Sequence, residues 1–192
     1  MIDERKLRLK KLIQERCIKI LGHDVTLSSG ETTNYYYDVK GLFDGEGLNL
    51  LGELMLAEIS KFNPKSVGGL EVGAIPLISV IVALDYYRKI SRTGVSGFYV
   101  RKSIKEHGLQ KKIEGNIQDP VAIVEDVMTT GSSIKLAIDA VKEQGASVVG
   151  VVCVIDREDP RNVIKDHIRC MPLYTHSEFE KFIEGQLSSR GK

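Results

Sequence analysis

An apolar run that ends in two carboxylates and a hydroxyl-rich turn, at residues 121–133, constrains the fold of this chain most. Residues 121–124 are all apolar, as expected of a strand buried on both faces of a parallel sheet. Glu125 and Asp126 end the predicted strand, where carboxylates should face a ligand or solvent. A helix is predicted next, because the apolar residues of 134–141 recur at helical spacing. This order of elements predicts an α/β domain.

The residues after the carboxylates indicate a phosphate site. Thr129, Thr130, Gly131, Ser132 and Ser133 offer hydroxyls and a flexible backbone directly before the predicted helix. The first N–H groups of a helix lack intrahelical acceptors and attract anions. Since carboxylates accept hydrogen bonds from sugar hydroxyls, the whole segment suits a ribose 5-phosphate. Taken alone, the acidic pair is equally consistent with a helix cap or a solvated strand end.

The remaining pattern predicts an alternation of strands and helices. We expect an opening amphipathic helix over residues 4–21 and strands at 25–27 and 34–39. Further helices are expected at 48–62, from Pro76 to about 88, and at 134–144, with strands at 66–70, 97–100, 121–124 and 148–155. Such alternation predicts a parallel sheet with helices on both faces and ligands at the carboxyl ends of the strands.

Composition narrows the class of protein. The 192 residues predict one domain, and 27 basic against 26 acidic residues give no overall field that would recruit nucleic acid or a membrane. The longest apolar stretch, residues 75–84, is too short to span a bilayer, and the charged N-terminus lacks a signal segment, so we expect a cytoplasmic protein. Three widely separated cysteines indicate reduced thiols, with no cysteine-held metal. Neither a P-loop nor a dinucleotide-binding fingerprint occurs.

A long polar segment at residues 101–116 interrupts this regularity. It has no helical apolar face and concentrates the basic side chains of Arg101, Lys102, Lys105 and His107. A structureless insert of this length in a compact domain is usually functional or disordered. Alone, it would more often be a solvated loop, but beside a phosphate site it predicts a mobile basic lid.

These two motifs together resemble those of the type I phosphoribosyltransferases. The segment Glu125-Asp-Val-Met-Thr-Thr-Gly-Ser-Ser133 matches the family's phosphoribosyl pyrophosphate motif, and Arg101-Lys-Ser-Ile-Lys-Glu-His-Gly108 matches the catalytic loop of its orotate branch. Residues 27–38 are similar to that branch's N-terminal substrate hood. The resemblance, which covers roughly residues 25–160, identifies the chain as a member of the orotate phosphoribosyltransferases.

The resemblance implies a single type I phosphoribosyltransferase-like domain over residues 1–192: a central, mostly parallel sheet flanked by helices, with a small N-terminal hood. Hood elements are expected at about 1–40 and in the C-terminal segment, the core at about 45–160 and the mobile loop at about 101–116. Relatives are commonly dimers whose basic loop reaches the neighbouring active site, so we expect a homodimer.

The implied reaction transfers the 5-phosphoribosyl group from phosphoribosyl pyrophosphate to orotate, giving orotidine 5′-monophosphate and pyrophosphate in pyrimidine synthesis. Mg²⁺ would be carried by the pyrophosphate, without a protein metal site. The implied catalytic residues are Lys102, Lys105, His107 and Asp126. The implied substrate-binding residues are Arg101, Lys102, Lys105 and His107 for pyrophosphate, Glu125 and Asp126 for ribose, Thr129 and Arg157 for orotate, and Val127, Met128, Thr130, Gly131, Ser132 and Ser133 in the phosphate motif.

Departures from the family pattern and alternative functions stay open at this stage. Some bacterial relatives have lysine before the Gly-Ile-Pro motif, where this chain has Val72 before Gly73, and Ser29 replaces a common hood lysine. Composition alone would make Arg157 a surface ion-pair residue and His176 structural or exposed. The alternatives are a phosphoribosyltransferase for another nucleobase and a non-catalytic phosphoribosyl pyrophosphate-binding regulator.

Overall fold

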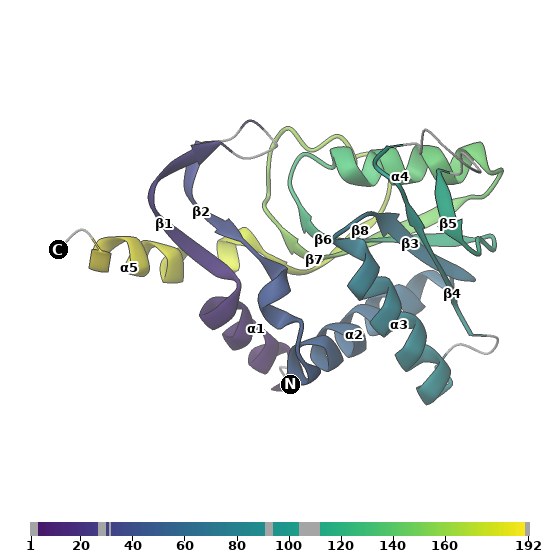
Figure 1. The fold of residues 1–192 in the computed structure, drawn as a ribbon, viewed down its shortest axis with the longest axis horizontal. Coiled ribbons are helices and arrows are strands. Elements are labelled where there is room, and N and C mark those ends of the chain that lie inside the picture. Colours follow the sequence, from purple (N-terminus) through teal and green to yellow (C-terminus); the bar gives the residue numbers. More distant parts are fainter. Residues whose placement is uncertain (1–3, 27–29, 31, 91–93, 104–111, 191–192) are drawn as a thin grey trace.

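A central six-stranded sheet lies between two helical layers in the computed structural model, which describes residues 4–26, 30, 32–90, 94–103 and 112–190. Helices α2 and α3 cover one face of this sheet and α4 covers the other, while a two-stranded sheet and the C-terminal helix α5 lie to one side (Figure 1). The expected α/β architecture with helices on both faces is confirmed.

The α-helices are α1 (Glu4–Arg16), α2 (Gly45–Ile59), α3 (Ala74–Arg88), α4 (Ser132–Glu143) and α5 (Glu180–Arg190). The strands are β1 (Ile18–Thr26), β2 (Thr32–Tyr37), β3 (Ser66–Leu70), β4 (Ser96–Val100), β5 (Ile113–Gly115), β6 (Val121–Met128), β7 (Val148–Asp156) and β8 (Cys170–Thr175). Short 3₁₀ turns are η1 (Val39–Leu42), η2 (Ser60–Phe62) and η3 (His176–Glu178).

The large sheet has the strand order β5-β4-β3-β6-β7-β8. Every neighbouring pair is parallel except β4 and β5, which are antiparallel. The order reverses between β3 and β6, and parallel strands of an open sheet leave a crevice outside their carboxyl ends at such a point. The sheet therefore places the carboxyl ends of β3, β6 and β7 together.

The apolar run at residues 121–124 is continuous because both faces of β6 are buried. Val121 and Ile123 belong to the core beneath α4, whereas Ala122 and Val124 belong to the core beneath α2 and α3. Successive side chains of a strand point to opposite faces, so each core receives every second residue. The same alternation continues through Glu125 and Asp126 and sends their carboxylates to opposite faces.

The N-terminal prediction was wrong in its boundaries. α1 ends at Arg16, and the expected helical residues 18–21 instead open β1, which pairs antiparallel with β2. Ile18 and Ile20 lie opposite Tyr37 and Tyr35 in this pairing. Cys17 and Ile20 continue the helical spacing that starts at Ile13, whereas Ile18 and Ile20 alternate as in a strand. The aromatic partner strand decided between the two patterns. In α1 the residues Leu9, Leu12 and Ile13 are buried, whereas Leu7 is 52% exposed.

Two further boundaries differ near the expected site. The strand predicted to stop at residue 124 continues to Met128, because β7 is long enough to pair with it as far as Asp156. The polar segment expected to be structureless at 101–116 contains β5, whose Ile113 pairs with Val100 of β4. A sequence pattern without alternation does not reveal such a short edge strand.

The other predicted elements are present with small shifts. α2 begins at Gly45, three residues before its predicted start, because the Asp44 carboxylate caps it by accepting the Gly47 N–H at 2.7 Å. Pro76 lies in the first turn of α3, as predicted. α4 begins at Ser132, two residues earlier than predicted.

The cysteines are free thiols, as predicted, and burial raises the pKa of the Cys17 thiol to about 12. Across the ranges that the structure describes, no helix has the length and apolar character needed to span a bilayer.

Candidate active site

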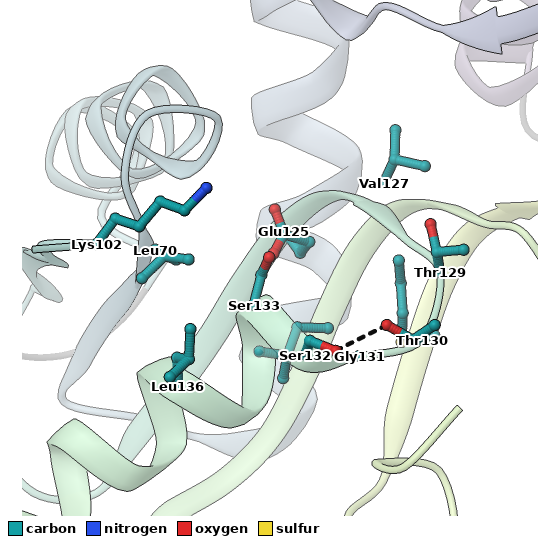
Figure 2. A pocket seen from close by; sticks show the side chains of 12 residues that line it. Leu70, Lys102, Glu125, Val127, Thr129, Thr130, Gly131, Ser132, Ser133 and Leu136 are labelled. Carbon is teal, nitrogen blue, oxygen red and sulfur yellow. Dashed lines mark hydrogen bonds between the residues drawn. The ribbon is translucent and has the colours of Figure 1, made fainter. Parts of the chain in front are cut away.

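A pocket of about 260 Å³ opens where β6 ends and α4 begins. Glu125 and residues 127–133 line it on one side, and Leu70 and Lys102 line it on the other. In Figure 2 the hydroxyl-bearing turn curls around the start of α4, and Lys102 projects into the opening from the opposite side. The strand, turn and helix predicted from sequence therefore meet around one cavity.

Gly131 allows the turn to close tightly at the start of α4. Its φ of +79° is a left-handed conformation that side-chain-bearing residues rarely adopt. A Cβ atom there would also lie 2.5 Å from Cγ1 of Ile164. The Thr130 and Ser132 hydroxyls are hydrogen-bonded at 2.8 Å beside it (Figure 2). Together with the first N–H groups of α4, these hydroxyls form a site suited to a phosphate.

The side chains of Glu125 and Asp126 lie on opposite sides of β6. Glu125 lines the pocket and is only 7% exposed, and burial, reinforced by the Asp126 charge, raises the pKa of the Glu125 carboxyl well above its ordinary value. Asp126 instead faces the start of α3, where a Cβ on Gly73 would come within 2.7 Å of Oδ2. Its Oδ1 accepts the Val127 N–H at 2.7 Å. The pair thus offers carboxylate oxygens toward both the pocket and the α3 terminus.

Lys102 lies on the wall of the pocket opposite the hydroxyl-rich turn. Its backbone N–H donates to the Glu71 carboxylate at 2.9 Å, which ties the beginning of the polar segment to the turn after β3. Its side chain lines the pocket beside Leu70. The segment after β4 therefore supplies one cation to this side of the pocket.

Asn162 supports the phosphate turn from behind, and sequence reasoning gave it no role. Its Nδ2 donates to the Thr129 carbonyl at 2.7 Å, and its Oδ1 accepts the Ile164 and Lys165 N–H groups at 2.9 and 3.2 Å. The Val163 N–H adds a bond to the Thr130 carbonyl at 3.0 Å. An asparagine in a polar loop carries no sequence signal for such a role, since its partner is 33 positions away.

Arg157 lies outside this pocket, in a cluster of rings. Its guanidinium carbon is 5.2 Å from the Tyr35 ring centroid and 5.9 Å from that of Tyr37. His176 lies against the same two tyrosines, with Nδ1 2.7 Å from the Tyr37 hydroxyl. Tyr35 to Tyr37 thus packs as predicted for a strand, and Arg157, although next to acidic residues in sequence, is nearly buried against it.

The structure brings together most, but not all, of the residues singled out in the sequence. Lys102, Glu125, Val127, Met128, Thr129, Thr130, Gly131, Ser132 and Ser133 line the pocket. Asp126 is directed to the α3 terminus, and Arg157 to the ring cluster. Arg101 points away, with Nη1 3.7 Å from Glu114. Lys105 and His107 lie outside the described residues.

Comparison with known proteins gives a consistent result. The sequence model for the phosphoribosyl transferase domain matches residues 59–185. The chain is 39% identical to orotate phosphoribosyltransferase of Aquifex aeolicus (strain VF5) over 184 residues, which cover 93% of this chain and 99% of the relative. It is 40% identical to the Pyrococcus horikoshii enzyme of the same name over 177 residues, covering 88% and 90%.

A solved structure shares the architecture. Mycobacterium tuberculosis H37Rv orotate phosphoribosyltransferase, in complex with 5-phospho-α-D-ribosyl 1-diphosphate, superposes with a TM-score of 0.71 at 28% identity. The match covers 92% of this chain and 99% of the other. The family match, the near full-length relatives and the shared fold agree with the strand-turn-helix pocket. The chain therefore belongs to the phosphoribosyltransferase family and to its orotate phosphoribosyltransferase branch.

Proposed function

We propose that this protein transfers the 5-phosphoribosyl group of phosphoribosyl pyrophosphate to orotate in pyrimidine nucleotide synthesis. In this reaction the bond from the anomeric carbon to pyrophosphate breaks, and a bond from that carbon to the orotate ring nitrogen forms, while the nitrogen loses its proton. The products are orotidine 5′-monophosphate and pyrophosphate. The observation that carries the proposal is the phosphate turn and carboxylate pair in a chain 39–40% identical to enzymes of that name.

The donor would bind at the carboxyl end of β6. Thr130, Gly131, Ser132 and Ser133, with the N–H groups at the start of α4, suit the 5-phosphate. Glu125 and Asp126 suit the ribose hydroxyls, and a carboxylate near the anomeric carbon would favour the positive charge that develops there.

The acceptor would bind between this pocket and the ring cluster. Orotate is a planar carboxylate, and the Arg157 guanidinium presents paired N–H donors of matching geometry. Thr129 lies at the beginning of the phosphate turn and is the second proposed contact. Residues 1–40 and the C-terminal segment would act as the hood over this side of a single domain.

The leaving group would meet the basic segment. Lys102 lines the pocket, and Arg101, Lys105 and His107 belong to the same segment. Cations around pyrophosphate would stabilise its developing charge, and closure of the segment would exclude water that could hydrolyse the donor. We place the reaction in the cytoplasm and assign the active form as a homodimer that shares this segment.

Magnesium enters the proposal through the diphosphate. Mg²⁺ prefers oxygen ligands, keeps several waters, and is commonly held by substrate phosphates with one or two carboxylates. Among the described residues there is no group of three His, Cys, Asp or Glu side chains able to hold a metal ion. An ion that arrives with the diphosphate would neutralise part of its charge without a protein metal site.

Turnover with several bases tests the proposed substrate. Purified protein with phosphoribosyl pyrophosphate and Mg²⁺ should consume orotate and leave uracil, adenine and hypoxanthine unchanged. Turnover of a purine with orotate inert would contradict the assignment. Salt-sensitive nucleic-acid binding without any turnover would support the regulator instead.

Mixing two inactive variants tests the shared segment. Asp126→Asn and Lys105→Ala would each lose activity alone. If the segment acts across the dimer, an equal mixture that exchanges subunits should regain about a quarter of wild-type activity, because half of the dimers are hybrids with one intact site. No recovery, with subunit exchange demonstrated by mass-tagged chains, would contradict the shared segment.

A further inference from the structure

His176 bridges two tyrosine hydroxyls. Its Nδ1 is 2.7 Å from the Tyr37 hydroxyl, and its Nε2 is 3.3 Å from the Tyr35 hydroxyl. The imidazole also lies parallel to the Tyr35 ring, with an interplanar angle of 7° and centroids 5.6 Å apart. Both ring nitrogens and one ring face are therefore committed to β2.

The same tyrosines hold Arg157 from another side. The Arg157 guanidinium lies over both rings, and its Nη2 donates to the Tyr35 hydroxyl at 3.4 Å. Tyr35 is thus in contact with both Arg157 and His176. A change in the position of either tyrosine ring must alter the surface on which the guanidinium rests.

The backbone around His176 is fixed to the backbone around Arg157. Asp156 and Thr175, the residues just before them, are partners in the parallel pairing of β7 and β8. The Glu158 carboxylate accepts the backbone N–H of Ser177 at 2.7 Å. These two residues directly follow Arg157 and His176 in the sequence. A capping box between Thr175 and Glu178 closes the His176 turn. The imidazole therefore stands on a support that is tied to the Arg157 segment on both sides.

We propose that His176 is a positioning residue for the acceptor base, acting through Tyr35 and Tyr37 on the direction of the Arg157 guanidinium. The inference rests on the proposed function and deepens it. Without the imidazole, both tyrosine rings lose a hydrogen-bonding partner and Arg157 gains rotational freedom. The donor turn of residues 129–133 lies on a different loop, so donor binding should change little.

Separate Michaelis constants for the two substrates test this role. His176→Ala should raise KM for orotate about three- to tenfold, the effect of losing one or two hydrogen bonds, and leave KM for phosphoribosyl pyrophosphate within about twofold. His176→Asn keeps a polar group near Nδ1 and should recover most of the loss, because that contact is the shorter one. His176→Gln keeps one near Nε2 and should recover less. His167→Ala, which removes an exposed histidine, is the matched control.

The outcomes separate this inference from the proposed function. An unchanged orotate KM in His176→Ala, or an equal rise in both constants, would overturn the positioning role even if orotate is the substrate. If wild-type protein uses another base, the proposed substrate is wrong. The KM for that base in His176→Ala, compared with the wild-type KM, then decides the role of His176. Calorimetric binding of orotidine 5′-monophosphate gives a readout without turnover, and a tenfold weaker affinity only in His176→Ala would support the inference.

Discussion

The donor pocket and the Arg157–His176 cluster are built in opposite ways. The pocket takes most of its lining from one continuous segment, residues 125–136, whose shape follows from one strand end, one left-handed glycine and one helix start. The cluster draws on segments up to 141 positions apart, joined at Tyr35 and His176. A site for a phosphate needs local backbone geometry, whereas a support for a planar acid needs large rings that only tertiary packing brings together.

The two regions also differ in what holds them. Backbone N–H and C=O groups dominate around the phosphate turn, including the braces from Asn162 and Val163. Ring stacking and hydroxyl contacts dominate in the cluster. Substitutions around the phosphate turn should therefore change both the KM for phosphoribosyl pyrophosphate and the stability of the protein. Substitutions in the Arg157–His176 cluster should change the KM for orotate.

The largest expected effect is the loss of the Asp126 carboxylate. Asp126→Asn should lower kcat by about 10²–10³-fold, the range seen when one preorganised electrostatic group is removed from an active site. Asp139→Asn, an exposed acid paired with Lys135 on α4, should leave kcat nearly unchanged. Steady-state assays with orotate measure both. A loss of less than tenfold for Asp126→Asn would remove Asp126 from the catalytic group.

Alanine at two left-handed glycines separates backbone strain from close packing. Gly131→Ala should destabilise the protein by about 2–4 kcal/mol, since its Cβ would meet Ile164 in addition to the unfavourable φ. Gly145→Ala, at φ +76° with open space around it, should cost only about 1 kcal/mol. Urea unfolding gives the two free energies. Equal values would mean that the turn tolerates the added atom.

Asn162 provides the donor-side counterpart to His176. Asn162→Ala should raise KM for phosphoribosyl pyrophosphate about three- to tenfold through loosening of Thr129, with little change in KM for orotate. Asn162→Asp keeps an acceptor for the Ile164 N–H but loses the donor to Thr129, so it should not restore donor binding. If Asn162 and His176 variants changed the KM of the same substrate, the division of the molecule into donor and acceptor regions would be wrong.

The last prediction concerns the pH dependence of stability. Because burial holds the pKa of Glu125 above its ordinary value of 4.5, the folded protein binds this proton more tightly than the unfolded chain does. Its contribution to stability is therefore lost as pH rises above about 4.5, with a slope of at most about 1.4 kcal/mol per pH unit. Glu125→Gln should flatten this decline when the free energy of urea unfolding is followed upward from about pH 4.5. If the difference in unfolding free energy between the two proteins did not change with pH, the raised pKa of Glu125 would be contradicted.

The fold was predictable where the pattern had a single interpretation. Residues 121–124, apolar on both faces, form an interior strand as predicted, Pro76 lies in the first turn of α3, and the helix predicted to end at residue 144 ends at Glu143. Residues 18–21 were assigned to the wrong element, because Cys17 and Ile20 continue the helical spacing of Ile13, and only the pairing with β2 shows that this segment is a strand. β5 was missed because three residues at a sheet edge carry too little pattern.

The sequence by itself predicted the proposed donor site, because phosphate recognition uses neighbouring backbone amides, hydroxyls and one glycine that must be contiguous to form a turn before a helix. It also determined the layered α/β class through the period of its apolar residues. Only the tertiary structure decided that Asp126 faces α3, that Lys102 closes the pocket, and that His176 lies behind Arg157. The reason is physical: these contacts depend on strand register and ring packing between distant segments, which no local pattern encodes.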